Sequence, residues 1–443
     1  MNLNQRWNYI EINSQGEMLI ENIPVSELVK QYDSPLYIIS ENKINENFIQ
    51  FKKAFSDYPK VCIQYACKCN SNMKVIEILK EAGAGLDASS PGEIILGLAL
   101  DISPDKISYT SGLKGPKEIA YALKKNIRYI TIDCFEDIYL IDKTASEMNL
   151  KANVVLRVNP EIKTKNYSTM ENKFGIKFSE ASEAINLILK SNNLNLKGFH
   201  FHGGYIHENQ IYYLALKKLI ELVKIVKENG VEIEDIDMGG GYPYPNMENS
   251  QEFNLEILGK EISNYLIEQF KLLNYRELPT LILEPGKFLV ANAGVSLVKV
   301  KAIKTLPNGK KAAITDGSTY GFLPDIIAYK WKYPIFVANK MNEPKTFTYN
   351  ICGCLCDPID ILSEDEKTPE LQNDDIIAIM DTGAYSNVVT SNFNTIPKAP
   401  ILIINNQKVT IARRREKYYE MFMPELQQGY INKMKNNIKE HSL

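Results

Sequence analysis

Lys68 stands where an apolar, strand-like run, Val61–Ala66, gives way to a polar turn. A lysine at the end of a buried strand is poorly hydrated, which lowers the pKa of its amine and makes the neutral, nucleophilic form accessible. A lysine that forms a Schiff base with an aldehyde needs that form. The alternative is a lysine that only extends its ammonium from a strand end into solvent, and Lys68 alone does not separate the two.

Two further motifs suggest the same kind of chemistry. Gly239-Gly-Gly241 would let backbone N–H groups approach an anion such as a phosphate, although such a run can also be only a turn. Glu284 precedes a Pro-Gly pair, so a rigid bend fixes its carboxylate. If it faces a pyridine nitrogen, it would keep that nitrogen protonated and make the ring a stronger electron sink. Its ordinary alternative is an exposed turn residue.

Three of the four histidines stand at positions 200, 202 and 207. The side chains of His200 and His202 would share one face of a strand, which could bind a metal ion. No carboxylate at an obvious ligand spacing accompanies them, so we predict no metal site. A flat imidazole stacked on a cofactor ring suits His202 better.

A cysteine cluster, Cys352, Cys354 and Cys356, would lie on one face of a strand. We expect Cys352 and Cys354 to pack in the core. Cys356, which is followed by Asp357, could supply a proton to a carbanion if its pKa suits.

The elements that would position these residues alternate regularly between about residues 61 and 290. Short apolar runs are separated by amphipathic, helix-like segments such as Met73–Ala82 and Gln210–Asn229. Eight such runs are typical of a (β/α)8 barrel, in which functional groups gather at the C-terminal strand ends. An open, doubly wound sheet is the alternative, because strand count does not show closure. The runs are Val61–Ala66, Gly85–Ala88, Ile107–Tyr109, Tyr129–Ile132, Val154–Val158, Leu196–Phe201, Ile233–Met238 and Thr280–Leu283.

Past residue 290 the chain reads as strands separated by turns, and residues 9–39 contain similar runs. We therefore expect a barrel domain over residues 36–295 and a mostly β domain built from residues 1–35 and 296–443. The acidic stretch Ser363–Pro369 and the segment Tyr242–Asn249 are expected to be solvated loops.

Bulk composition excludes several function classes. A net charge of −3, from 51 basic and 54 acidic residues, suggests neither a nucleic-acid nor a membrane partner. No apolar run reaches the roughly 20 residues of a membrane span, and Met1–Asn8 lacks the apolar stretch of a signal peptide. Seven irregularly spaced cysteines indicate reduced thiols. We therefore expect a cytoplasmic protein.

Together these motifs resemble the fold-type III pyridoxal-phosphate enzymes, the group of diaminopimelate and ornithine decarboxylases. The resemblance runs along nearly the whole chain in the family's order, and it implies an alanine-racemase-like barrel with a β domain. The motifs are Tyr65–Asn70 (YACKCN), Gly85–Glu93 (GLDASSPGE), Asn172–Ile176 (NKFGI), Gly198–Gly204 (GFHFHGG), Asp237–Gly241 (DMGGG), Glu284–Lys287 (EPGK) and Gly383–Tyr385 (GAY), followed by Ala412–Glu416 (ARRRE).

The resemblance implies that pyridoxal 5′-phosphate is the cofactor. Lys68 would form the Schiff base, with Asp87 supporting it or the ring. His202 would stack on the pyridine ring and Glu284 would pair with its nitrogen. The residues implied for the phosphate are Gly239, Gly240, Gly241, Gly286 and Tyr385. Lys287 is implied as a further cofactor-binding residue.

The resemblance also implies amino-acid decarboxylation. Cys356 would protonate the carbanion that remains after carbon dioxide leaves. Family members are dimers with shared active sites, so we expect a homodimer in which Cys356 reaches the partner subunit's site.

Departures from the family leave the substrate open. Diaminopimelate decarboxylases usually have arginine at the position of Lys287 and at that of Leu323, serine at Tyr205, and Cys-Glu-Ser where this chain has Cys356-Asp-Pro358. Two lost guanidiniums remove bidentate grips on the distal carboxylate of meso-diaminopimelate, although Lys287 keeps a charge.

Three substrate classes therefore remain: meso-diaminopimelate; ornithine or lysine; and an amino acid with a neutral or tethered distal end, such as one on a carrier protein. Asp316 and Asp357 resemble the acids with which ornithine decarboxylases hold a distal ammonium. Tyr385 and Lys287 are further candidates for substrate contact.

Two other classes of function compete. Alanine racemase shares the fold type, but the His-x-His strand and Cys356-Asp357 favour the decarboxylase branch. A non-catalytic, decarboxylase-like regulator would have lost cofactor contacts, whereas Lys68, Glu284 and Tyr385 are all present.

Overall fold

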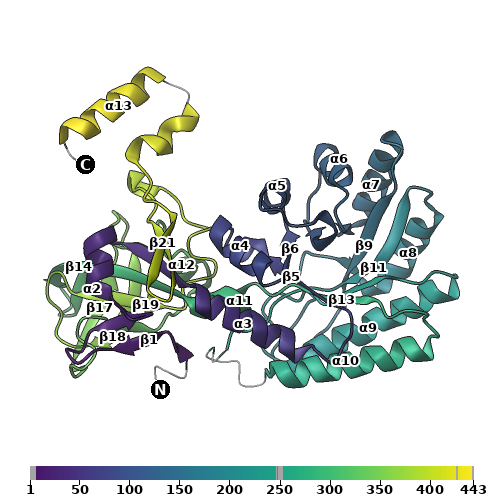
Figure 1. The fold of residues 1–443 in the computed structure, drawn as a ribbon, viewed down its shortest axis with the longest axis horizontal. Helices are drawn as coiled ribbons and strands as arrows, with labels where there is room; N and C mark the ends of the chain where they lie inside the picture. Colours follow the sequence, from purple (N-terminus) through teal and green to yellow (C-terminus); the bar gives the residue numbers. More distant parts are fainter. Residues whose placement is uncertain (1–5, 246, 248–252, 426–427, 442–443) are drawn as a thin grey trace. The chain divides into compact units, whose positions relative to one another are not determined.

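The computed structural model describes residues 6–245, 247, 253–425 and 428–441. The chain divides into two compact units, one of residues 45–289 and one that combines residues 1–44 with 290–443 (Figure 1). We call them the barrel and the β domain.

Eight parallel strands close the barrel. They pair in the order β5-β6-β7-β8-β9-β11-β12-β13, and β13 pairs in turn with β5. The predicted (β/α)8 fold is therefore confirmed, and the open sheet is excluded. The strands are β5 (Val61–Ala66), β6 (Gly85–Ala88), β7 (Ile107–Tyr109), β8 (Tyr129–Ile132), β9 (Ala152–Asn159), β11 (Leu194–His200), β12 (Asp235–Asp237) and β13 (Thr280–Leu283), with β10 (Ile176–Lys177) added beside β9.

Helices alternate with these strands, and three of them begin at a residue whose side chain caps the helix. The side chain of Asn72 accepts a hydrogen bond from Lys74 N at the start of α4, and Ser90 and Asn254 cap α5 and α10 in the same way. The helices are α3 (Glu41–Ala54), α4 (Met73–Glu81), α5 (Pro91–Ala99), α6 (Pro116–Lys125), α7 (Phe135–Glu147), α8 (Ala181–Lys190), α9 (Asn209–Glu228), α10 (Leu255–Leu272) and α11 (Lys287–Val290), with short 3₁₀ turns at Cys67–Cys69, Pro104–Lys106 and Phe178–Glu180.

The β domain contains two sheets. Its large sheet is ordered β18-β17-β15-β14-β4-β20-β21, and β19 joins β14 to β16; the small sheet is β1-β2-β3. Their strands are β1 (Ile10–Ile12), β2 (Met18–Ile20), β3 (Ile23–Pro24), β4 (Leu36–Ser40), β14 (Gly294–Thr305), β15 (Lys311–Thr315), β16 (Ile335–Val337), β17 (Phe347–Cys352), β18 (Ile361–Thr368), β19 (Ile376–Met380), β20 (Ile401–Asn405) and β21 (Lys408–Arg413). The helical elements are α2 (Val25–Tyr32), α12 (Asp325–Tyr329) and α13 (Gln428–His441), with 3₁₀ turns at Ala291–Ala293, Phe393–Thr395 and Tyr418–Glu425.

Two expectations about this domain were wrong. Strand β4 was assigned to the barrel, but it pairs with β14 and β20 in the large sheet, a pairing that local periodicity does not reveal. The acidic stretch Ser363–Pro369 was expected to be a loop, but most of it lies in β18. This strand buries Leu362 and Thr368 and, within the described residues, pairs only with β17, so its charged side chains lie on a sheet edge.

The segment from Tyr242 onward is a loop, but its described part is not solvated. Tyr242 and Tyr244 are buried, and the ring of Tyr242 stacks on Tyr212 with centroids 4.8 Å apart. Aromatic packing accounts for the difference, while residues 246, 248 and 249 lie outside the described chain. Among the described helices, none has the length and apolar character needed to cross a membrane.

Candidate active site

Lys68 and Asp87 meet at the C-terminal ends of neighbouring barrel strands. Lys68 lies in the 3₁₀ turn that follows β5, and Asp87 belongs to β6. The ammonium Nζ is 2.9 Å from Asp87 Oδ2, and Asp87 is fully buried whereas a third of the Lys68 side chain is exposed. The other oxygen of Asp87, Oδ1, makes no hydrogen bond within the described residues.

The protonation of Lys68 differs from the sequence expectation. Burial lowers the pKa of Lys68, but the carboxylates of Asp87 and Glu284 attract its ammonium more strongly, so the pKa lies above its ordinary value. The expectation of an easily neutralised amine was therefore wrong, because the partner carboxylate is 19 residues away in sequence. The amine must lose a proton before it can attack an aldehyde.

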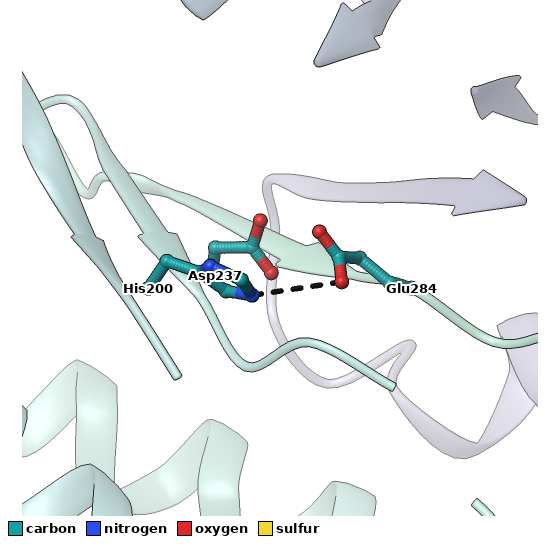
Figure 2. A group of neighbouring side chains, drawn as sticks. All are labelled: His200, Asp237 and Glu284. Carbon is teal, nitrogen blue, oxygen red and sulfur yellow. Dashed lines mark ion pairs between the residues drawn. The ribbon is translucent and has the colours of Figure 1, made fainter. Parts of the chain in front are cut away.

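A buried cluster, His200, Asp237 and Glu284, lies at the ends of β11, β12 and β13. Figure 2 shows the three side chains directed toward one another, with His200 Nε2 3.5 Å from Glu284 Oε2. Asp237 accepts hydrogen bonds from Tyr129 OH at 2.6 Å and from Gly239 N at 2.8 Å. Neither oxygen of Glu284 makes a hydrogen bond within the described residues.

The pKa values of the two carboxyl groups in this cluster shift in opposite directions, that of Asp237 upward and that of Glu284 downward. Burial, and then the charge of Glu284, raise the pKa of Asp237 well above its ordinary value. Burial also raises the pKa of Glu284, but His200 and Lys68 together lower it further, so the net shift is downward. Glu284 is thus the group held ionised in this pair.

These three residues correct the reasoning about metals. The sequence offered no carboxylate beside the histidines, yet Asp237 and Glu284 adjoin His200, with ligand atoms within 4.8 Å of one another. Both oxygens of Asp237 already accept hydrogen bonds, which makes it a poor ligand. The unbonded oxygens of Glu284 fit a cationic N–H donor at least as well as a metal ion.

His202 lines a cavity of about 420 Å³ together with Lys68, Arg157 and Phe174. Its Nδ1 accepts a hydrogen bond from Gly204 N at 2.9 Å. Burial, followed by the charges of Lys68 and Arg157, lowers the pKa of His202 well below its ordinary value. The imidazole is therefore neutral and protonated on Nε2, as suits stacking on an aromatic ring.

The glycine loop, Gly239–Gly241, has a backbone that side chains would obstruct. A Cβ on Gly240 would lie 2.4 Å from the carbonyl oxygen of Glu284, and one on Gly241, where φ is +97°, would lie 2.2 Å from that of Gly204. In the described chain, the N–H groups of Gly240 and Gly241 donate no hydrogen bond to a protein acceptor. Gly286 approaches Cys69 with similar closeness.

These observations fit pyridoxal phosphate. Free backbone N–H groups suit a phosphate, and the buried, ionised Glu284 suits a pyridinium nitrogen. Lys68 supplies the amine and His202 a neutral ring. A cavity of this size also falls within the usual range for small-molecule sites, roughly 300–1,000 Å³.

The remaining predicted residues lie in the β domain. Cys356 and Asp357 occupy the turn after β17, where Asp357 accepts a hydrogen bond from Tyr320 OH at 3.2 Å. Cys354 and Cys356 are both exposed. The expectation of three thiols on one strand, with Cys354 in the core, was wrong because β17 ends at Cys352.

Asp316 is engaged by its own domain. It accepts hydrogen bonds from Ser34 Oγ at 2.6 Å and from Lys299 N at 2.8 Å. Leu323 is fully buried, and Tyr385 is half-buried with a φ of +56°. A cavity of about 890 Å³ in this domain, lined in part by Arg415 and Tyr418, includes none of the predicted residues.

Sequence reasoning missed Arg157 and Tyr129, and it quoted Asp237 within a motif without giving it a role. Arg157 lies beside the cavity, 3.1 Å from Asp133, with its guanidinium 4.5 Å from the centroid of Phe174. An arginine inside the apolar run Val154–Val158 was a signal that could have been used, because a charge there needs a buried partner. Tyr129 gave no such signal.

Comparison with known proteins gives consistent matches. Residues 41–291 match the family described as pyridoxal-dependent decarboxylase, pyridoxal binding domain. Diaminopimelate decarboxylase of Methanocaldococcus jannaschii is 29% identical over 424 residues, covering 93% of this chain and 95% of that protein. The Helicobacter pylori protein of the same name is 30% identical over 407 residues, covering 90% and 98%. A crystal structure of the M. jannaschii enzyme with L-lysine has a TM-score of 0.87 at 29% identity and covers 94% of this chain and 97% of its own.

Proposed function

The chain belongs to the pyridoxal-dependent decarboxylases and is an amino-acid carboxy-lyase with pyridoxal phosphate as its cofactor; on this premise we propose a role for each active-site residue and a substrate class. The resemblance identified from the motifs is thereby confirmed. When bound, pyridoxal phosphate would supply an electron sink for the electron pair that stays on the substrate's Cα as carbon dioxide leaves.

In our proposal, Lys68 is the attachment residue and Asp87 holds its ammonium near the ring. Glu284 keeps the ring nitrogen protonated, and neutral His202 stacks on the ring face. The observation that carries the proposal is the buried carboxylate of Glu284, which has no hydrogen bond in the described chain and lies beside His200. A buried carboxylate without a hydrogen bond is costly unless a cation completes the site.

For the substrate we propose diaminopimelate or a close analogue. The relatives above are diaminopimelate decarboxylases that match over at least nine-tenths of this chain. Ornithine receives less support, because Asp316 is already engaged by Ser34 and Lys299.

A second candidate is an amino acid whose distal end is neutral or tethered. It is favoured by Leu323, which is apolar and fully buried at the position of the family's second arginine. An aliphatic side chain cannot grip a carboxylate, so a substrate without a free distal charge would lose nothing there.

A substrate panel separates these candidates. Purified protein loaded with pyridoxal phosphate is incubated with meso-diaminopimelate, both enantiomers of ornithine and lysine, L-glutamine and L-homoglutamine, and carbon dioxide release is measured. We expect release from diaminopimelate. Release only from the amides favours the neutral-ended class, and release only from ornithine or lysine overturns both proposals.

Lys68→Ala is the test of the attachment role. The variant is expected to lose turnover and the absorption band of covalently attached cofactor, although it can still bind pyridoxal phosphate non-covalently. A variant that keeps both the band and turnover contradicts the assignment of Lys68.

We also infer a homodimer in which Cys356 serves the partner subunit's site, as the family resemblance implies. Mixing inactive Lys68→Ala and Cys356→Ala subunits should restore about a quarter of the wild-type activity, because random exchange leaves one complete site in each mixed dimer. Absence of recovery, with subunit exchange verified, contradicts shared sites. Seven free thiols support a reducing, cytoplasmic location.

A further inference from the structure

Two departures from the family, Tyr205 and Lys287, contact each other. The Nζ of Lys287 lies 4.4 Å from the centroid of the Tyr205 ring, within the range of a cation–π interaction. The family usually has serine and arginine at these positions, so the contact joins two substitutions that are 82 positions apart in sequence (287 less 205). Tyr205 is 42% exposed, so its ring does not serve the barrel core.

The segments that carry these residues both bind the glycine loop. Ile206 N donates to the carbonyl oxygen of Gly241 at 3.3 Å, and Gly204 approaches Gly241 as described above. Glu284 N donates to the carbonyl oxygen of Gly239 at 2.8 Å. The Tyr205–Lys287 contact is therefore built on two segments that are fixed to the same loop, the one whose free N–H groups suit a phosphate.

Lysine needs such a neighbour more than arginine does. Arginine presents a rigid fork of donors that matches a phosphate by itself, whereas lysine places a compact charge on a flexible stem. An aromatic ring that holds the ammonium from one side limits the positions open to it and preserves its charge. Burial, and next the charge of Lys287, lower the pKa of His207, which therefore contributes no competing cation.

We propose that Tyr205 and Lys287 act as one unit that holds the 5′-phosphate of the cofactor at the glycine loop, with the ring of Tyr205 positioning the ammonium of Lys287. This inference depends on the proposed assignment of the glycine loop to the phosphate. The pair stands at the two positions where the family usually has serine and arginine, and the effect of Lys287 on the phosphate depends on Tyr205.

The test measures cofactor affinity of the apo-protein by absorption or fluorescence titration. Tyr205→Ser should weaken binding of pyridoxal phosphate about two- to fivefold, the equivalent of an exposed cation–π contact. Tyr205→Phe keeps the ring and should bind as the wild type does. Adding Lys287→Arg to Tyr205→Ser, which restores the family's usual pair, should return affinity to within about twofold of the wild-type value.

Two controls make the result specific. Pyridoxal, which lacks the phosphate, should bind all variants equally. Tyr213→Ser removes a comparable contact on α9, where Lys217 Nζ lies 4.5 Å from the Tyr213 ring, and should leave affinity unchanged. The proposal is overturned if Tyr205→Ser has no effect, if pyridoxal binding falls in parallel, or if Lys287→Met weakens binding equally with and without Tyr205.

Failure of the proposed function is distinguishable from failure of this inference. A loaded protein that shows the Tyr205–Lys287 coupling but releases carbon dioxide from none of the amino acids contradicts the substrate proposal alone. If the protein decarboxylates an amino acid but Tyr205→Ser leaves its cofactor affinity unchanged, the result contradicts this inference alone.

Discussion

Replacing Asp87 with asparagine should speed cofactor attachment at neutral pH. The ammonium of Lys68 is held by Asp87 at 2.9 Å, and its pKa is raised by Asp87 and Glu284 against the effect of burial. A raised lysine pKa means a smaller neutral fraction at every pH below it. Asparagine has nearly the same shape but no charge, so Asp87→Asn should lower the pKa of Lys68 and increase that fraction.

The size of the effect follows from the geometry. An opposite charge at hydrogen-bonding distance shifts a pKa by about 1–3 units, and each unit is worth about 1.4 kcal/mol. Because a third of the Lys68 side chain is exposed, solvent screening places the effect toward the lower end, about 1–2 units. The neutral fraction, and with it the attachment rate at a fixed pH, should then rise about 10- to 100-fold.

Stopped-flow absorbance after mixing apo-protein with pyridoxal phosphate gives the rate between pH 6 and 9. In the wild type the rate should climb about tenfold per pH unit, because pH stays below the pKa of Lys68 throughout. The Asp87→Asn curve should run parallel at higher rates. Asp235→Asn is the matched control, since it breaks a different, partly buried ion pair, with Arg128.

Coincident wild-type and Asp87→Asn curves, with both proteins folded, would refute the idea that Asp87 sets the protonation of Lys68. A slower Asp87→Asn would instead assign Asp87 a role in accepting the proton that the amine must lose. Either result would require a different account of the raised pKa.

Three further variants test the site. Glu284→Gln keeps the shape but removes the charge, so turnover should fall about 100-fold or more while cofactor remains bound; an unchanged kcat would argue against the ring-nitrogen role. Gly240→Ala should weaken cofactor binding at least about tenfold, since its Cβ meets a carbonyl oxygen at 2.4 Å, whereas Gly429→Ala meets nothing within 4 Å and should be silent in the same titration. Tyr129→Phe strips a donor from buried Asp237 and should cost about 1–3 kcal/mol in urea unfolding; a smaller loss would mean that another donor replaces it.

Local patterns predicted the barrel well. The runs Val61–Ala66 and Thr280–Leu283 coincide with β5 and β13 residue for residue, because a buried parallel strand is a continuous apolar run bounded by turns. The charged residues of β18 led to the wrong prediction of a loop. In this strand Leu362 and Thr368 are buried, while the acidic residues between them are exposed or half-buried. Burial does not alternate along β18, so no period of two marks this stretch as a strand in the sequence.

Long-range contacts account for most of what was missed in the site. Motif order singled out Lys68 and Glu284 as candidates, but the pKa of Lys68 depends on Asp87 from the next strand, and that of Glu284 depends on His200 from another strand. The contact of Tyr205 with Lys287 was likewise not visible, although both positions had been recognised as departures. Pairing between strands has to be known before such neighbours can be named.

The hydrogen bond from Tyr129 to Asp237 connects the packed interior of the barrel to the buried cluster of the active site. Tyr129 opens β8 and its hydroxyl reaches across the barrel interior to the end of β12. Under the proposed assignment of this cluster to the cofactor ring, mutations in the packed interior would change the reactivity of the cofactor, as would mutations at the residues that touch it. Substitutions among the interior neighbours Val155 and Ile282, which pack with Tyr129, could tilt the phenol and retune the chemistry while every cofactor contact stays intact. Differences in turnover between related barrels are therefore worth seeking in interior packing residues as well as in the residues that contact the cofactor.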